Sequence, residues 1–467
     1  MRGWASLFAG ACAVALVACG RADTTTSPGT SPGAASAGND ASSVVSNADA
    51  AAATNDEPAQ FAGPAALDAT GERFVKLALG LGHHDTAFVD AYHGPAEWAA
   101  SLDANPPEID ALEKDARDLL TEIKTINAAS PSVRGAMQEK LAAAALMRIR
   151  MTQGETVAFD EETRVLYDAV APGYDLADFD AALAEIDALL PGDEPLAARV
   201  EAFNAKIAIP AERLQAVFDA AIAECRRRTL AHFDLPEKER FSLEFVTDKP
   251  WSGYNWYQGD FESLIQVNTD FPIFIDRAID LGCHEGYPGH HTWNVFLERD
   301  ILGREGWIEY SVYPLFSALS LIAEGSANYG IDLAFPGEEK IAFERDVLFP
   351  LAGLDPAQAE TLGRLNAARR KLSHVRNHIA REYLDGRITR DDAVRLAMRY
   401  RLETADRADQ TVRFMETYRG YVLNYSLGLD LVDQYIAKRT GDDGNARWEA
   451  FRTLLTTPLA ASDLEKE

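Results

Sequence analysis

Long amphipathic runs constrain this chain most, because their apolar residues recur at spacings of three and four. That spacing places the apolar side chains on one face of a helix, which must then be buried against a neighbour. Ser263 to Asn268 instead alternates and is rich in branched residues, which predicts a short β-strand. The expected fold is mostly α with a small β-sheet. Helices are expected over six segments: 109–125, 133–152, 214–229, 313–334, 357–384 and 390–400.

The 467-residue chain is acidic, with a formal net charge of −28, and 47% of its residues are hydrophobic. A nucleic-acid binder needs clustered Lys and Arg to neutralise phosphates, so this charge argues against nucleic acid as a partner. The hydrophobic residues suffice for a large core, and no clear linker divides the chain after residue 64. We expect one helix-rich domain over 64–467, with a helical half over 64–240 and a second half over 241–467.

The first eighteen residues are typical of a lipoprotein signal peptide. One Arg precedes an apolar run that is too short for a comfortable membrane span. The run ends in Leu-Val-Ala-Cys, which resembles the bacterial lipobox and predicts that Cys19 carries a lipid. The alternative is an ordinary signal peptide with an unrelated Cys.

Residues 19–63 are almost all small and polar and contain no apolar period, which predicts a flexible tether. A lipid anchor, a tether and an acidic body together indicate a protein of the bacterial cell envelope, on the outer membrane and facing the periplasm. Cys225 and Cys283 remain in the body. They form a disulfide in an oxidising compartment or stay as separate buried thiols.

A histidine-rich segment, LGCHEGYPGHH over 281–291, is the strongest candidate for a functional site. It is similar to the H-E-x-x-H helix of metalloproteases, in which two His bind zinc and the Glu takes a proton from the zinc-bound water. Here His284 and His290 are six residues apart, so on a straight helix their rings diverge by about 600° and about 9 Å. Pro288 lacks an N–H and Gly289 tolerates unusual dihedral angles. A bend there is expected to bring His290 back towards His284.

Glu324 is the candidate for a third ligand. It closes an apolar stretch and is predicted to be buried, and a buried carboxylate must be paired or bound to metal. With His284 and His290 it gives a two-His, one-Glu zinc site with an open position for water. The alternative is that the His residues only cap or hydrogen-bond a helix.

These segments resemble the bacterial domain-of-unknown-function 885 family. The chain matches His-Glu-x-x-Pro-Gly-His at 284–290, Glu-Gly-x-Ala-x-Tyr at 324–329, an Arg and a His at 370 and 378, and Tyr and Gly at 425 and 428. The resemblance spans about Phe74 to Tyr435. It weakens near the end, where Arg419-Gly420-Tyr421 replaces the family's Pro-Gly-Gln. It implies a zincin-like, mostly helical hydrolase with a deep groove, distantly similar to the carboxypeptidase Taq and neurolysin groups.

The resemblance also suggests catalytic roles. Glu285 is expected to be the general base, and His378 and Tyr425 are expected to stabilise the oxyanion. His374, four residues before His378, is the weaker of the two His candidates. The alternatives are a solvated basic helix face for both His residues and a packed aromatic ring for Tyr425.

Further residues are candidates for supporting or substrate-binding roles. Asn328 is expected to orient a ligand His, and His291 to support the site. Asn268 is expected either to pair with an extended substrate backbone or only to pack in the core. Arg413 is expected to bind a substrate carboxylate or to form a surface ion pair. The segment DAYHGP over 90–95 is interpreted as a helix end and turn, with Tyr92 or His93 lining a groove.

The sequence therefore predicts a membrane-tethered, zinc-dependent hydrolase, most simply a metallopeptidase acting on peptides or small amides. A non-catalytic lipoprotein that binds a peptide or a partner in a degenerate zincin site is the first alternative. A metallohydrolase of non-peptide amides or esters is the second. The side chains of 284, 290 and 324 should converge on one point if the metal site exists.

Overall fold

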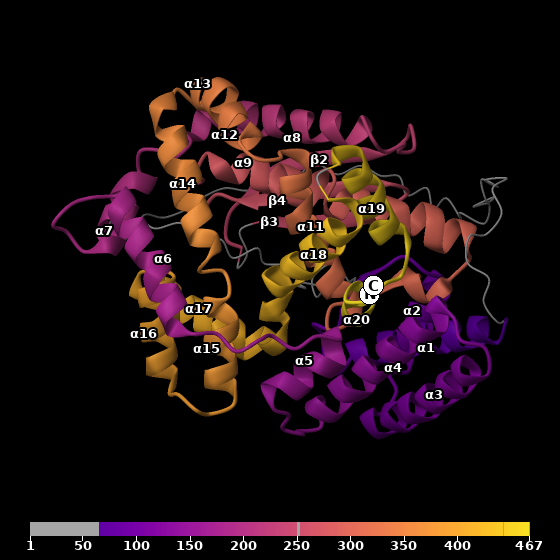
Figure 1. Cartoon of the computed structure of the whole chain (residues 1–467). Coiled ribbons are helices and arrows are strands. Elements are labelled where there is room, and N and C mark those ends of the chain that lie inside the picture. Colours follow the sequence, from indigo (N-terminus) through magenta and orange to yellow (C-terminus); the bar gives the residue numbers. More distant parts are fainter. Residues whose placement is uncertain (1–64, 250–252, 442, 467) are drawn as a thin grey trace, which may run out of the picture.

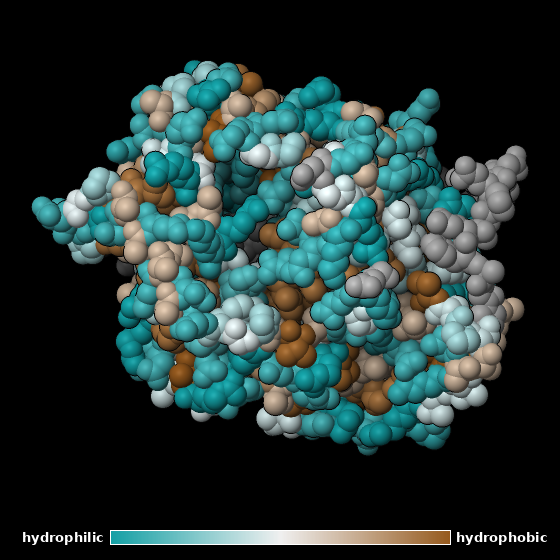
Figure 2. All heavy atoms as spheres, in the orientation of Figure 1, coloured by the Kyte–Doolittle hydropathy of each residue, from teal (hydrophilic) through white to brown (hydrophobic). Residues whose placement is uncertain are grey.

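The structure, a computed structural model, describes residues 65–249, 253–441 and 443–466. The predicted signal peptide, the lipidated Cys19 and the tether over 19–63 lie outside the described residues. Most of the described chain is helical, with one three-stranded and one two-stranded sheet (Figure 1). None of its helices combines the length and the apolar character needed to cross a bilayer. Polar side chains cover most of the face in Figure 2, and apolar ones gather towards its middle and lower part.

The first helices form a group at one corner of the molecule (Figure 1). α4 begins after Ser132, whose hydroxyl accepts the backbone N–H of Gly135. A buried ion pair joins Arg134 of α4 to Glu309 at 2.7 Å, which ties this group to the segment before β5. The elements here are α1 (Ala66–Gly82), β1 (Val89–Tyr92), α2 (Ala96–Ala104), α3 (Ile109–Ala129), α4 (Val133–Thr152) and α5 (Phe159–Tyr167).

The remaining helices lie outside this first group, and among them α11 (Ala318–Ala334) is buried along most of its length. They are α6 (Leu176–Leu189), α7 (Leu196–Asn204), α8 (Leu214–Leu230), α9 (Asp276–Leu281), α10 (His290–Phe296), α12 (Glu339–Phe343), α13 (Phe349–Ala352), α14 (Ala359–Arg370), α15 (Val375–Leu384), α16 (Arg390–Tyr400), α17 (Ala405–Tyr418), α18 (Leu427–Thr440), α19 (Gly444–Thr456) and α20 (Ala461–Leu464). Shorter 3₁₀ or π turns are η1 (Ala211–Arg213), η2 (Gly282–Gly286), η3 (Leu297–Arg304), η4 (Ile308–Ser311), η5 (Glu344–Leu348), η6 (Pro356–Gln358) and η7 (Arg419–Tyr425).

A glycine contact sets the distance between α11 and α18. A Cβ atom on Gly325 would lie 2.4 Å from the carbonyl oxygen of Gly428, and one on Gly428 would lie 2.7 Å from that of Leu321. The two backbones therefore approach to a distance that only glycine permits. This close packing buries the neighbouring Glu324 completely.

The three-stranded sheet contains β2 (Arg240–Val246), β4 (Glu262–Asn268) and β3 (Gly253–Gly259) in that spatial order. β2 runs parallel and β3 antiparallel to the central β4, so β3 forms one edge. Ser263, Ile265 and Val267 of β4 are buried, which matches the alternation in the sequence. The second sheet pairs β1 with β5 (Val312–Pro314) in antiparallel fashion.

The predicted helices over 109–125, 133–152, 214–229 and 390–400 and the strand over 263–268 are confirmed. Two of the predicted helices were too long. The start of 313–334 is strand β5, and α11 begins only at Ala318. The segment 357–384 is divided into α14 and α15, because a run of i to i+3 hydrogen bonds tightens the chain over 371–375. The helix end predicted over 90–95 was also wrong, since α1 ends at Gly82 and β1 begins at Val89.

Candidate metal centre

The histidine-rich segment bends where the sequence predicts. α9 continues into the π turn η2, the Tyr287–Pro288 peptide bond is cis, and α10 begins at His290. A Cβ atom on Gly289 would lie 1.8 Å from the carbonyl oxygen of His284. Glycine is therefore required at this bend.

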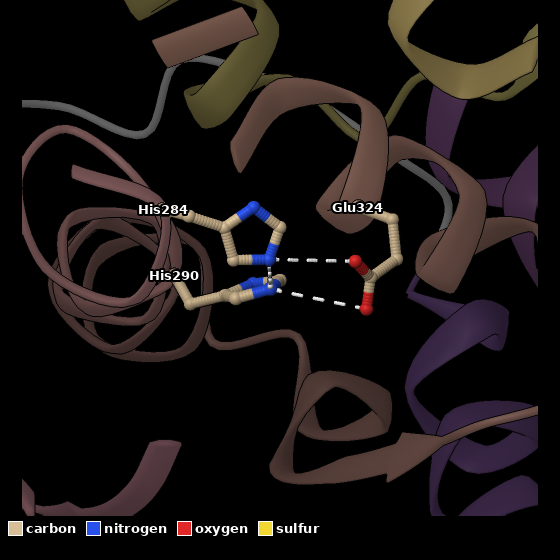
Figure 3. A group of neighbouring side chains, drawn as sticks. All are labelled: His284, His290 and Glu324. Atoms are coloured by element: carbon tan, nitrogen blue, oxygen red, sulfur yellow. Dashed lines mark hydrogen bonds and ion pairs between the residues drawn. The ribbon is translucent and has the colours of Figure 1, made fainter. Parts of the chain in front are cut away.

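The bend brings the two His rings together (Figure 3). Their Nε2 atoms are 3.2 Å apart. Two nitrogens bound to one tetrahedral zinc at about 2.0–2.1 Å are themselves about 3.3–3.4 Å apart. The His pair therefore has the separation that a shared ion requires.

Glu324 of α11 reaches the same point from the opposite side (Figure 3). Its Oε2 lies 3.5 Å from His284 Nε2, and its Oε1 lies 3.9 Å from His290 Nε2. All three side chains are buried, and their ligand atoms lie within 4.8 Å of one another. Two imidazoles and one carboxylate are a donor set that suits zinc, so the residues present fit the predicted metal.

Neighbouring side chains orient these ligands. The Oδ1 atom of Asn328 lies 3.1 Å from His284 Nδ1, and its Nδ2 donates to the backbone oxygen of Tyr425 at 3.1 Å. This contact turns His284 so that Nε2 faces the other two ligands. The hydroxyl of Tyr421 donates to Glu324 Oε1 at 2.8 Å. Asn328 thus occupies the predicted position, whereas the contact of Tyr421 with Glu324 was not predicted from the sequence.

Glu285 is buried beside the cluster, with 1% of its surface exposed. Among residues 65–249, 253–441 and 443–466, neither carboxylate oxygen has a hydrogen-bond partner. Burial raises the pKa of Glu285 to about 7, against the opposing effect of His284. A carboxylate with this pKa can both take up and release a proton near neutral pH.

The two His residues differ in proton affinity. Burial and the charge of His284 lower the pKa of His290 to about 4. Burial also acts to lower the pKa of His284, but the hydrogen bond with Glu324 and the charges of Glu285 and Glu324 raise it above its ordinary value. The neutral His290 therefore offers a lone pair to a cation, as a metal ligand must.

The two His residues considered for the oxyanion role, His378 and His374, contact other parts of the fold. His378 packs edge-on against Phe179 of α6, with ring centroids 6.4 Å apart, and it does not line the cleft described below. His374 stacks on Tyr174 and pairs with Asp430 at 3.0 Å. α14 ends at Arg370 and α15 begins at Val375, so the chain bends between them. His374 then lies beside α18, and His378 lies beside α6. The structure thus does not bring His378 to the metal cluster.

The backbone of Tyr425 contributes to the candidate site. Its ring packs against the ring of Tyr421, with centroids 5.7 Å apart, and lies 5.6 Å from the guanidinium of Arg376. Its carbonyl oxygen accepts the amide of Asn328. The oxyanion role of its phenol stays a prediction.

Three other candidates have structural partners. His291 is fully buried and contacts Ser263 at 2.8 Å and Glu239 at 3.1 Å, on the sheet side of α10. Asn268 donates to the Lys249 backbone at 2.9 Å, and its strand β4 lies inside the sheet, where no edge is open to a substrate. Arg413 forms an exposed ion pair with Asp409 one turn away. Of the two interpretations of Arg413, the surface ion pair therefore fits the structure.

A disulfide joins Cys225 of α8 to Cys283 of η2. Of the two alternatives for these cysteines, the structure has the pair. The bond fixes the backbone directly before His284, because Cys283 is its chain neighbour. Disulfides persist in oxidising compartments, which agrees with the expected envelope location.

A cleft with a volume of about 1190 Å³ opens next to His290. It lies between β1, the edge strand β3, α10 and β5. Tyr92 and His93 line it, as the sequence analysis suggested for a groove. The cleft therefore reaches one of the three metal-ligand candidates, His290.

Neither a protein-family model nor a curated protein matches this chain. Among solved structures, the chain is similar to the crystal structure of a "putative lipoprotein from Colwellia psychrerythraea". The two are 15% identical, with a TM-score of 0.47, over 84% of this chain and 74% of that chain. The resemblance to the domain-of-unknown-function 885 family stays a prediction, and the function is inferred from this chain's own residues.

Proposed function

We propose that this chain is a zinc-dependent hydrolase with a zincin-like architecture, related to the domain-of-unknown-function 885 family, and that it cleaves peptide bonds. One observation carries the proposal: three buried ligand atoms converge beside a buried carboxylate that has no partner among the described residues. Three protein ligands leave a fourth tetrahedral position open, as in catalytic zinc sites.

Each residue of the cluster has a role in this chemistry. His284, His290 and Glu324 would hold the ion, which would supply Lewis acidity to the site when bound. Glu285 would take a proton from the attacking water molecule and return it to the leaving nitrogen. Asn328 and Tyr421 keep the ligands in position.

The alternatives make different demands on the site. A degenerate, non-catalytic binding site has no need for convergent ligands, whereas here the two His nitrogens are 3.2 Å apart. A hydrolase of non-peptide amides or esters needs the same cluster, so substrate panels have to separate it from a peptidase. The cleft is large enough for either kind of substrate.

Metal content tests the first part of the proposal. The full chain, purified in detergent, is expected to hold one zinc per molecule, and Glu324→Ala and His290→Ala are expected to lose it. His374→Ala is the matched control, because its ring contacts Tyr174 and Asp430 instead. If the wild type binds no metal even when zinc is offered, the proposal is contradicted. That result favours the alternative of a non-catalytic lipoprotein that binds a peptide or a partner.

Activity tests the second part. Zinc-loaded wild type is incubated with a peptide library and with a panel of esters and non-peptide amides. Glu285→Gln should keep its zinc and lose turnover, because the amide cannot take up the proton. Turnover of esters alone would replace the peptidase with the second alternative, and equal turnover by Glu285→Gln would remove Glu285 from the mechanism.

We also propose that a lipid on Cys19 tethers the hydrolase to the bacterial envelope. The lipobox-like sequence supports this location, and so does the disulfide between Cys225 and Cys283. Metabolic labelling with a fatty acid should mark the wild type and not Cys19→Ser. Labelling of both would place the lipid elsewhere.

A further inference from the structure

Asp90 occupies an irregular position in the small sheet. The register between β1 and β5 shifts between Val89 and Ala91, so Asp90 stands at a bulge. The backbone pairing continues on both sides of the bulge. The N–H of Leu315 donates to the carbonyl oxygen of Phe88 at 2.8 Å, and the N–H of His93 donates to that of Ser311 at 2.7 Å. Bulges redirect a side chain and are frequent beside active sites. Here the redirected carboxylate lines the cleft that reaches His290.

Asp90 has little to balance its charge. Its Oδ1 accepts the hydroxyl of Tyr254 at 2.9 Å, and none of the described residues forms an ion pair with it. Burial raises the pKa of Asp90 to about 6, although the Tyr254 hydrogen bond acts in the opposite direction. A carboxylate in such surroundings is stabilised by a positive partner.

The other carboxylates of the cleft already have partners. Asp103 pairs with His83 at 3.4 Å, and Asp260 pairs with Lys238. Glu298 accepts the hydroxyl of Tyr257 at 2.5 Å and the backbone N–H of Asp260 at 3.1 Å. Glu298 is thus held by three neutral donors, whereas Asp90 accepts a single hydrogen bond, so Asp90 is the carboxylate of the described lining best placed to meet a ligand.

The rest of the lining favours a cation as well. No Lys or Arg is among the described residues that line the cleft, so a positive ligand meets no like charge there. Aromatic side chains also line the cleft, among them Tyr92, Trp256, Trp293 and Tyr254, the hydrogen-bond partner of Asp90. Faces of such rings attract ammonium and guanidinium groups.

We propose that Asp90 determines specificity by binding a positively charged group of the substrate, an ammonium or a guanidinium. This inference rests on the proposed hydrolase function and adds the charge of its substrate. Asp90 and His290 line the same cleft, so the recognised cation would lie in the space that reaches the metal-ligand candidates. The cation is either the α-ammonium of the peptide or a Lys or Arg side chain close to the cleaved bond.

The test uses the full, zinc-loaded chain and peptides in matched pairs. One arm compares a free amino terminus with its N-acetyl form, and the other compares Lys with norleucine next to the cleaved bond. Wild type should prefer the cation in one arm by about tenfold or more in kcat/KM. Asp90→Asn keeps the shape of the side chain and removes its charge. It should bring the ratio of kcat/KM between the cationic and the neutral peptide close to one. Asp103→Asn is the control and should keep the ratio, since Asp103 already pairs with His83.

Binding to the inactive Glu285→Gln chain separates this inference from the proposed function. Calorimetry with the same peptide pairs should show the cation preference, and Asp90→Asn in that background should abolish it. A preference in binding without turnover in the wild type overturns the hydrolase but keeps the role of Asp90. The role of Asp90 is overturned if the cationic and the neutral peptide of each pair bind equally well. It is also overturned if a preference for the cationic peptide survives Asp90→Asn.

Discussion

The hydrogen bond between Tyr421 and Glu324 can be removed by deleting a single atom. In Tyr421→Phe the ring remains and the hydroxyl that donates to Glu324 Oε1 at 2.8 Å is lost. Both side chains are fully buried, so water cannot easily take the place of the hydroxyl. The bond holds the carboxylate with its Oε2 towards His284, at 3.5 Å. We expect the zinc affinity to fall in this variant.

The expected magnitude follows from the charge and burial of the bond. A hydrogen bond to a charged group contributes about 1.5–3 kcal/mol, and about 1.4 kcal/mol corresponds to a tenfold change in a binding constant. Loss of a residue that positions a metal ligand typically weakens metal binding about 10- to 100-fold. The dissociation constant for zinc should therefore rise by about one to two orders of magnitude.

Competition with a chromophoric chelator under buffered zinc measures this constant. Tyr167→Phe is a matched control, because its ring lies 6.3 Å from that of Tyr421 and its buried hydroxyl has no hydrogen-bond partner in the described part of the chain. It should bind zinc like the wild type. Unchanged affinity in Tyr421→Phe, or an equal loss in Tyr167→Phe, would refute the proposed role of this hydrogen bond.

Three further predictions concern the segment around His284. Gly289→Ala should lose zinc and about 3 kcal/mol of unfolding free energy in denaturant, because the new Cβ atom meets the carbonyl oxygen of His284. Gly444→Ala is the control and should change neither quantity, since a Cβ atom there meets open space. A Gly289→Ala chain that folds and binds zinc like the wild type would contradict the close approach. The pKa of Glu285 rises from 4.5 to about 7 on folding, so ionisation favours the unfolded chain. As the pH rises from 4.5 to 7, the unfolding free energy of the metal-free wild type should therefore fall by about 3 kcal/mol relative to that of Glu285→Gln. A difference between the two unfolding free energies that does not change with pH would refute this prediction. Reducing the disulfide, whose cysteines are 58 residues apart, should cost about 4 kcal/mol and lower the melting temperature, whereas a variant with Ala at Cys225 and Cys283 should not respond to reductant.

Much of the metal cluster could be predicted because its signals are local. The apolar surroundings of Glu324 indicate burial, and Pro288 with Gly289 indicates the bend that unites the His pair. Helix periodicity also found α3, α4, α8 and α16. In each case the residues that decide the outcome are neighbours in the sequence.

The side-chain directions that the sequence did not indicate depend on packing between distant segments. Tyr421 and Tyr425 would share a face on an α-helix, but η7 is a 3₁₀ helix, in which four residues rotate about 120° beyond a full turn. Tyr421 therefore reaches Glu324, and the ring of Tyr425 faces Arg376. His378 was misplaced for a similar reason, since the division between α14 and α15 cannot be recognised from a continuous amphipathic pattern. The bulge at Asp90 depends on its pairing with β5, more than 200 residues later.

The support of Glu324 by Tyr421 has a consequence for biosynthesis. The two residues are 97 positions apart, and Asn328 is joined to Tyr425 over the same separation. A nascent chain that ends before η7 has the three proposed zinc ligands but lacks the groups that hold two of them in place. For the proposed zinc site, high-affinity loading would therefore wait until the last part of the chain has been made and has folded. Contacts between such distant segments form slowly, so metal uptake is expected to be a late step in maturation.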